Sequence, residues 1–192
     1  ASAKNIEELL QDFNSQCLLH GIAQSDLDKS WKELAYPKKD IAEVVFIKSM
    51  LQRELPEEIR ENIVGILFEK YVKCSESELA QDIYMSVDEL KELIAQGMYV
   101  GSHAYNHFWL DSVSYDLQKK EIEKSLHFLE GIGAPTNDWI MCYPYGAHNE
   151  ETIQIIKEKG CALALGTEVG ATNLDLQNRY SLKRWDTNDF PQ

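Results

Sequence analysis

The second half of the chain alternates short apolar runs with amphipathic helical segments, and this alternation constrains the fold more than any other feature. Residues 98–102, 139–143 and 161–165 are apolar runs of strand length, and residues 179–185 are expected to form a last strand. Between them, apolar side chains recur at helical spacing. Strands that alternate with helices predict right-handed crossovers and a parallel sheet or partial barrel. The expected fold class is therefore α/β.

Capping residues mark the helix boundaries in this half. Ser86 and Glu89 have the spacing of a capping box, which predicts that a helix of about eleven residues begins there, and Gly97 stands where such a helix would end. Asn149 is expected to cap a later helix that Gly160 closes. These local signals place the helices between the expected strands.

The first half of the chain has a different pattern. Apolar side chains recur three or four residues apart through most of residues 1–83, as Ile6 and Leu10 do. Pro56 precedes two glutamates and suits the first turn of a helix, because proline has no amide hydrogen to leave unpaired there. We expect two regions: a helical insertion or subdomain over residues 1–83, and the strand–helix region over residues 84–192.

Composition excludes several classes of protein. The 192 residues are 44% hydrophobic and 10% aromatic, which argues against disorder. The formal net charge of −13 argues against binding to nucleic acid or to an anionic membrane surface, because phosphate contacts need clustered Lys and Arg. No apolar run approaches the roughly 20 residues that cross a bilayer, so no membrane span is expected.

Cysteine usage and the first residues of the sequence bear on the compartment. The first eight residues lack the basic and apolar segments of a signal peptide. The cysteines are scattered and form no C-x-x-C pattern, so we expect free thiols in a reducing compartment, and hence a cytoplasmic protein. They are Cys17, Cys74, Cys142 and Cys161.

Two histidines follow the first expected strand. If the segment turns helically, His103 and His107 share one face, because residues four apart are neighbours on a helix. Two imidazoles so placed can bind one metal ion at about 2.0–2.1 Å each. A catalytic zinc site usually has three protein ligands, so two unrelated polar residues are the alternative interpretation of this pair.

Two further segments follow expected strands. The sequence Tyr-Pro-Tyr-Gly at residues 143–146 predicts a sharp turn that could aim the backbone amide of Tyr145 at a reacting oxygen, since preorganised backbone donors stabilise an oxyanion. A plain strand-to-helix turn is the alternative. Arg184 and two carboxylates, Asp186 and Asp189, follow the last expected strand, where either Asp could be a metal ligand or orient one. An ion pair in an Asx-rich turn is the alternative there.

Aromatic residues flank these segments. Trp109, Tyr143 and His148 lie next to them in the sequence. Flat rings suit the faces of sugars, so these three residues are candidate substrate contacts. Packing in the core, or an ordinary loop position for His148, is the alternative.

Taken together and in this order, the three segments resemble a known family. Gly-Ser-His-x-x-x-His, Tyr-Pro-Tyr-Gly-x-x-Asn-Glu-Glu and Arg-x-Asp-Thr-Asn-Asp-Phe are similar to the motifs of the polysaccharide deacetylases, the NodB-homology domains, over roughly residues 83–190. The resemblance implies an incomplete (β/α) barrel of NodB type with an all-helical N-terminal insertion. It also implies hydrolysis of the acetamide of an N-acetylated sugar or polysaccharide, a carbohydrate partner, and a divalent metal, most often zinc, as cofactor.

The resemblance also implies roles for individual residues. His103 and His107 match the two histidine ligands of the metal, and the backbone of Tyr145 matches the donor to the oxyanion. Arg184 and Asp186 would orient the site. Tyr145, Arg184 and Asp186 are thus the candidate catalytic residues.

The chain departs from the family pattern in several places. The family's Asp-Asp-Gly motif supplies the general base and the third metal ligand, but no Asp-Asp pair occurs in the 192 residues. Cys142 stands where the family has an arginine. We expect that this chain is the C-terminal portion of a longer deacetylase and is inactive by itself. The alternatives are a non-catalytic relative that binds a carbohydrate or another partner, and an unrelated α/β domain.

Overall fold

The chain divides into two compact units, Ala1–Ile83 and Tyr84–Gln192. The structure, a computed structural model, describes residues 3–37, 40–172 and 179–190. The division falls where the sequence pattern changes from continuous helix to strand–helix alternation. Within the described residues, no helix is both long enough and apolar enough to cross a membrane.

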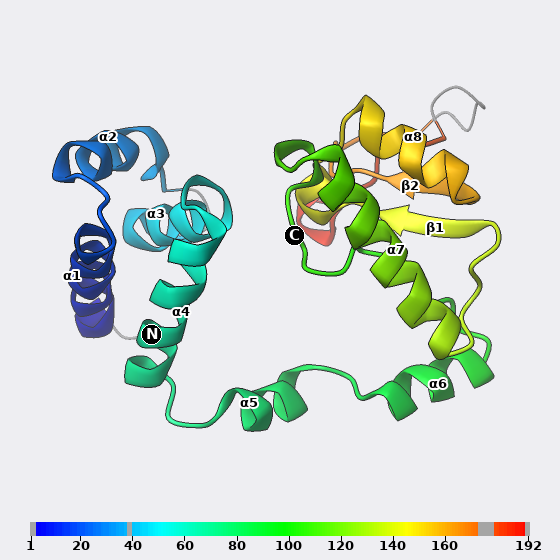
Figure 1. Ribbon diagram of the computed structural model, residues 1–192, viewed down its shortest axis with the longest axis horizontal. Coiled ribbons are helices and arrows are strands. Elements are labelled where there is room, and N and C mark those ends of the chain that lie inside the picture. The colour runs from blue at the N-terminus through cyan, green and yellow to red at the C-terminus, as the bar shows by residue number, and fades with distance from the viewer. Residues whose placement is uncertain (1–2, 38–39, 173–178, 191–192) are drawn as a thin grey trace. The chain divides into compact units, whose positions relative to one another are not determined.

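The first unit consists of helices around one apolar core (Figure 1). Phe46 lies at its centre, where the rings of Phe13 and Trp31 meet it edge-on at centroid distances of 5.9 and 5.0 Å. The helix predicted after Pro56 is confirmed. The helices of this unit are α1 (Ala3–Leu19), α2 (Gln24–Leu34), α3 (Ala42–Ser49), a π-helical turn (Met50–Glu54), α4 (Glu57–Tyr71) and α5 (Glu76–Ile83).

Charged and polar side chains join α1 to α4. Lys70 on α4 pairs with Asp12 and, at 3.1 Å, with Glu8, both on α1. The hydroxyl of Tyr71 also donates a hydrogen bond to Asp12. These bonds to Lys70 and Tyr71 hold the pKa of Asp12 below its ordinary value of 3.8.

The second unit contains a parallel pair of strands, as the α/β pattern predicts. Its strands β1 (Trp139–Cys142) and β2 (Cys161–Leu165) lie side by side and are connected through α8 (Glu150–Glu158) (Figure 1). Trp139 and Met141 of β1 are fully buried and belong to the same apolar cluster as residues of α8 and of α7 (Tyr115–Gly131). Alternate strand residues point to opposite faces, so one face of the pair packs against these helices.

The two segments that flank this pair, expected as strands, each make only one bridge. Ser102 makes a single parallel bridge to Met141, and Leu182 makes one to Leu165. Residues 98–102 and 179–185 therefore do not form strands. At the first segment the hydroxyl of Tyr99, rather than a backbone carbonyl, accepts the N–H of Ile140 at 2.7 Å. A side chain thus takes the place of a ladder bond, and backbone pairing is confined to Ser102.

The capping signals are confirmed. Ser86 accepts the N–H of Glu89 while the Glu89 carboxylate accepts the N–H of Ser86, which opens α6 (Val87–Ala95). The helix has nine residues, two fewer than expected. Asn149 caps α8 in the same reciprocal way with Thr152. Short 3₁₀ turns complete the unit at Leu110–Ser112, Pro144–Gly146 and Thr187–Asp189. The barrel and the insertion implied by the family resemblance stay predictions.

Candidate functional site

Two loops meet beside the carboxyl end of β1. The first, residues 103–109, follows the bridge residue Ser102, and the second, residues 143–148, follows β1 itself. Ser102 and Met141 pair in parallel, so the two segments deliver their following loops to the same edge. In parallel α/β folds, ligands bind at this edge.

The first loop brings the two histidines together, although not in the way predicted. The rings of His103 and His107 have centroids 4.7 Å apart and planes at 70°. The expected helical turn is wrong, because Ala104 and His107 adopt left-handed backbone angles, with φ of 59° and 60°. Such conformations cost a non-glycine residue about 1–2 kcal/mol, so the surrounding contacts must hold the loop in this shape.

A backbone contact orients the ring of His103. Its Nδ1 lies 2.6 Å from the carbonyl oxygen of Cys142. A carbonyl only accepts hydrogen bonds, so Nδ1 carries the hydrogen and, in the neutral ring, Nε2 presents a lone pair. Metal-binding histidines are typically oriented by a bond of this kind.

The environment of His107 favours the neutral ring. Desolvation lowers the pKa of His107 below its ordinary value of 6.5, and the neighbouring His103 lowers it further. A metal ion binds the neutral imidazole, so this environment suits a ligand.

Tyr145 connects the two loops. Its ring meets His107 edge-on at a centroid distance of 4.6 Å and stacks on Trp109 at 4.4 Å, with planes 7° apart. Four rings from two loops therefore lie in a continuous row. The row runs through His103, His107, Tyr145 and Trp109.

The backbone around Tyr145 is tightly held. Tyr145 itself is left-handed, with φ 57° and ψ 7°. The hydroxyl of Thr167 donates to its carbonyl oxygen at 3.3 Å. At Gly146, which has φ 74°, an added Cβ would lie 2.2 Å from that hydroxyl oxygen. Only glycine fits this turn, because both the backbone angle and the available space exclude a side chain.

A buried carboxylate supports the first loop, and sequence reasoning missed it. Glu121 of α7 is only 1% exposed and accepts three hydrogen bonds from Tyr105 and Asn106 of the loop. The signal in the sequence was a charged residue on the apolar side of an amphipathic helix, where Glu is rarely found without partners. Gln118 and Ser125 share that buried side of α7.

Tyr143 and His148 form a second aromatic contact. Their rings stack at a centroid distance of 4.2 Å, with planes 13° apart. Tyr143 is fully buried, its hydroxyl donates to the carbonyl of Tyr180, and burial raises its pKa. The structure thus places Tyr143 in the core, which differs from the predicted substrate contact. His148 is half-buried, with Nδ1 2.9 Å from the Gly146 carbonyl and Nε2 3.1 Å from the Ser181 hydroxyl.

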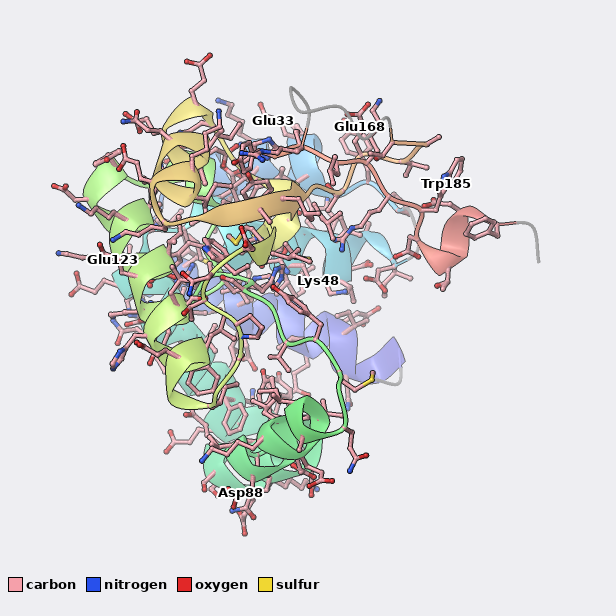
Figure 2. All side chains as sticks on the ribbon, turned by 90° about the vertical axis from the view of Figure 1, so that its right-hand side faces the viewer. Glu33, Lys48, Asp88, Glu123, Glu168 and Trp185 are labelled. Atoms are coloured by element: carbon pink, nitrogen blue, oxygen red, sulfur yellow. The ribbon has the colours of Figure 1, made fainter. Side chains whose placement is uncertain are left out.

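Arg184 and Asp186 lie in the exposed C-terminal segment of the unit. The N–H of Arg184 donates to the carbonyl of Glu168 at 3.1 Å, and the N–H of Asp186 donates to the carboxylate of Asp189 at 2.7 Å. In Figure 2, Trp185 between them lies on the opposite side of the unit from the labelled Glu123 of α7. The catalytic roles of Arg184 and Asp186 stay predictions.

The histidine pair has no third metal-ligating side chain grouped with it in the described part of the chain. Among residues 3–37, 40–172 and 179–190, no three His, Cys, Asp or Glu side chains gather so that they could hold a metal ion. Beside the pair, an open hollow of about 380 Å³ has His103, Tyr105 and Phe128 in its lining. The site thus combines two neighbouring imidazoles with a row of aromatic rings, and the hollow adjoins it at His103.

Comparison with known proteins gives a family match. The family model described as polysaccharide deacetylase matches residues 54–164. The matched region begins at the end of the π-helical turn and so includes α4 and α5 of the first unit. It therefore begins about 30 residues before the motif resemblance, which covers residues 83–190. It includes His103, His107 and Tyr145 but ends before Arg184 and Asp186.

One curated relative is YxkH of Bacillus subtilis (strain 168), whose name assigns it to the polysaccharide deacetylases. The two sequences are 28% identical over 101 residues, which are 53% of this chain and 36% of the relative. The chain therefore spans about a third of the length of this relative.

Two solved structures are similar to the chain. The Streptococcus pyogenes deacetylase PplD in complex with acetate aligns with a TM-score of 0.48 and 17% identity, over 92% of this chain and 79% of that one. The BpsB deacetylase domain from Bordetella bronchiseptica aligns with a TM-score of 0.45 and 20% identity, over 53% and 49%.

Proposed function

The chain belongs to the polysaccharide deacetylase family, whose model matches 111 of its 192 residues, and from this premise we propose that it forms the histidine-bearing part of a metal-dependent hydrolase. The substrate is an N-acetylated sugar or polysaccharide, and the reaction releases acetate. The observation that carries the proposal is the pairing of His103 with His107 beside an oriented backbone contact at Cys142.

The donor set fits part of a zinc site. Imidazole nitrogens are good zinc ligands, and Nε2 of His103 is left available by the bond from Nδ1 to Cys142. The lowered pKa of His107 keeps the second ring in its metal-binding form at neutral pH. A catalytic zinc usually takes a third protein ligand, and the described residues offer no such cluster.

His103 and His107 would hold the metal, and Tyr145 would stabilise negative charge. When bound, a divalent metal acts as a Lewis acid toward the acetamide carbonyl and activates the attacking water. Tyr145 has a left-handed backbone, and its ring contacts His107. This held conformation supports the backbone N–H of Tyr145 as a preorganised donor to the oxyanion. Trp109, stacked on Tyr145, offers an aromatic surface to a sugar ring.

The third metal ligand and the general base are proposed to come from protein outside this sequence. A third ligand and a general base are needed, and the chain spans 36% of the relative YxkH. Arg184 and Asp186 are proposed to orient the site within this chain. We therefore expect that the 192 residues alone bind zinc weakly and release little acetate.

The test combines metal titration with acetate release. The chain is titrated with zinc by calorimetry and then incubated with N-acetylated chitooligosaccharides. Zinc binding that is lost in both H103A and H107A supports the assignment of ligands. Turnover by the zinc-loaded chain at ordinary enzyme rates would refute the assignment of the base to protein outside this sequence. Zinc-independent oligosaccharide binding without acetate release would instead favour a carbohydrate-binding module.

A further inference from the structure

We propose that Glu121 is the positioning residue of the loop over residues 103–107, setting the distance between His103 and His107. The inference rests on the proposed function in so far as the histidines are metal ligands. Glu121 is proposed neither as a metal ligand nor as a substrate contact. It acts through the backbone that carries the two histidines.

The contacts of Glu121 converge on the centre of this loop. Its Oε2 accepts the backbone N–H of Asn106 at 2.6 Å and that of Tyr105 at 3.2 Å. Its Oε1 accepts the side-chain amide of Asn106 at 2.7 Å. Both carboxylate oxygens are therefore used on the two residues that directly precede His107.

Burial makes these contacts strong. A carboxylate that is 1% exposed is unfavourable unless its oxygens are hydrogen-bonded, and bonds to an ionised acceptor are stronger than neutral ones. The carboxylate is supplied by α7, which is itself anchored to α8. Glu123 of α7 pairs with Lys159, the residue that follows α8, at 2.7 Å. The acceptor thus stands on a rigid element.

The loop needs such an acceptor because its backbone is strained. Ala104 and His107 are left-handed and lie on either side of the two amides that Glu121 accepts. A second bond from α7, between the hydroxyls of Ser125 and Ser102 at 2.6 Å, holds the residue before His103. Helix α7 therefore fastens the loop before its first histidine and before its second.

A matched pair of variants separates positioning from helix stability. E121A removes the acceptor of the loop amides. Q118A removes an equally buried polar side chain one turn earlier on α7. The Gln118 side chain bonds to Val113 and Thr152 and not to the loop over residues 103–107. E121Q is the conservative variant: its oxygen accepts both backbone amides, and the Asn106 amide rotates to accept from the new NH₂.

A pair of changes across the Glu121–Asn106 contact tests the same point with both side chains kept close to their native size. N106D places a second carboxylate opposite Glu121 and is expected to open the loop by like-charge repulsion. Adding E121Q to N106D restores a donor–acceptor pair. A general effect on helix stability does not predict this rescue, so the comparison decides the proposal even where E121A fails to fold.

Two readouts are used on the full 192-residue chain. The first is amide hydrogen exchange at Tyr105 and Asn106, and the second is the zinc dissociation constant from calorimetry. We expect E121A to lose the protection of both amides and to bind zinc about 10- to 100-fold more weakly, while Q118A and E121Q resemble the parent. N106D should behave like E121A, and the double variant like the parent.

The readouts keep the two proposals apart. If the parent chain binds no zinc, the proposed metal site fails, and amide exchange alone decides the role of Glu121. If E121A and Q118A protect the two amides equally, or if E121Q does not rescue N106D, Glu121 is not the positioning residue, whatever the zinc affinity.

Discussion

Nδ1 of His103 lies 2.6 Å from the carbonyl oxygen of Cys142, the last residue of β1. This bond joins the loop after Ser102 to the end of the strand and decides which ring nitrogen carries the hydrogen. His107 sits beside it at a ring distance of 4.7 Å. The chemistry of the site therefore depends on a contact between segments about forty residues apart in sequence.

Removal of either histidine should abolish zinc binding. H103A and H107A each leave one imidazole, which is too few ligands for a stable site. H127A is the matched control, because His127 is an exposed histidine on α7. Calorimetric titration with zinc checks the prediction, and it is wrong if H103A binds zinc as tightly as H127A does.

Gly146 should tolerate no side chain. G146A places a Cβ 2.2 Å from the hydroxyl oxygen of Thr167 at a backbone with φ 74°, so we expect a loss of at least about 1–2 kcal/mol in the free energy of unfolding. At Gly131, the last residue of α7, an added Cβ meets nothing within 4 Å. G131A should be neutral or stabilise the protein by up to about 1 kcal/mol. Urea unfolding of both variants gives the comparison, and similar losses would contradict it.

The contact between α1 and α4 should make the first unit sensitive to acid. The pKa of Asp12 is lowered in the folded protein, so its contribution to stability is present above its unfolded value near 3.8 and is lost as the pH falls through the folded value. The difference in unfolding free energy between the parent and D12N should therefore be constant near neutral pH and shrink below about pH 4. Urea unfolding across this range, with E7Q on the same helix as control, measures it. A difference that is unchanged at pH 2 would contradict the prediction.

Two of the cysteines should resist alkylation in the folded protein. Burial raises the pKa of Cys17 and of Cys161 to about 11, so few of these thiols are ionised at pH 8 and reagents do not reach them. Cys74 and Cys142 are only half-buried and should be labelled first. Peptide mass spectrometry after brief iodoacetamide treatment distinguishes the two pairs, and in urea all four should be labelled. Equal labelling of Cys17 and Cys74 without urea would count against the burial of Cys17.

Local signals predicted the helices well because their causes are local. The capping boxes at Ser86 and Asn149 each close within three residues, and both are present. The segments at 98–102 and 179–185 were expected as strands, yet each makes a single bridge. Strand formation depends on a partner elsewhere in the chain, and apolar composition alone does not reveal how much of a run is paired.

At the candidate site, too, the residues could be predicted from the sequence but most of their contacts could not. The spacing of His103 and His107 was enough to predict that the two rings meet, but through a helical turn that does not exist. Trp109 was singled out as an aromatic neighbour, whereas its stacking on Tyr145 depends on two loops meeting. Tyr143 was expected to face a substrate and is instead fully buried.

Residue type and spacing along the chain were enough to identify the chemistry-bearing residues, the order of the helices and the family to which the chain belongs. The folded structure was needed to show which nitrogen of His103 carries the hydrogen, which rings stack, and that Glu121 accepts hydrogen bonds from the loop. These features arise from hydrogen bonds and ring contacts between residues from fifteen to about forty positions apart. Such contacts form only when α7, β1 and the two loops pack together, because neither partner has the other within reach in the extended chain.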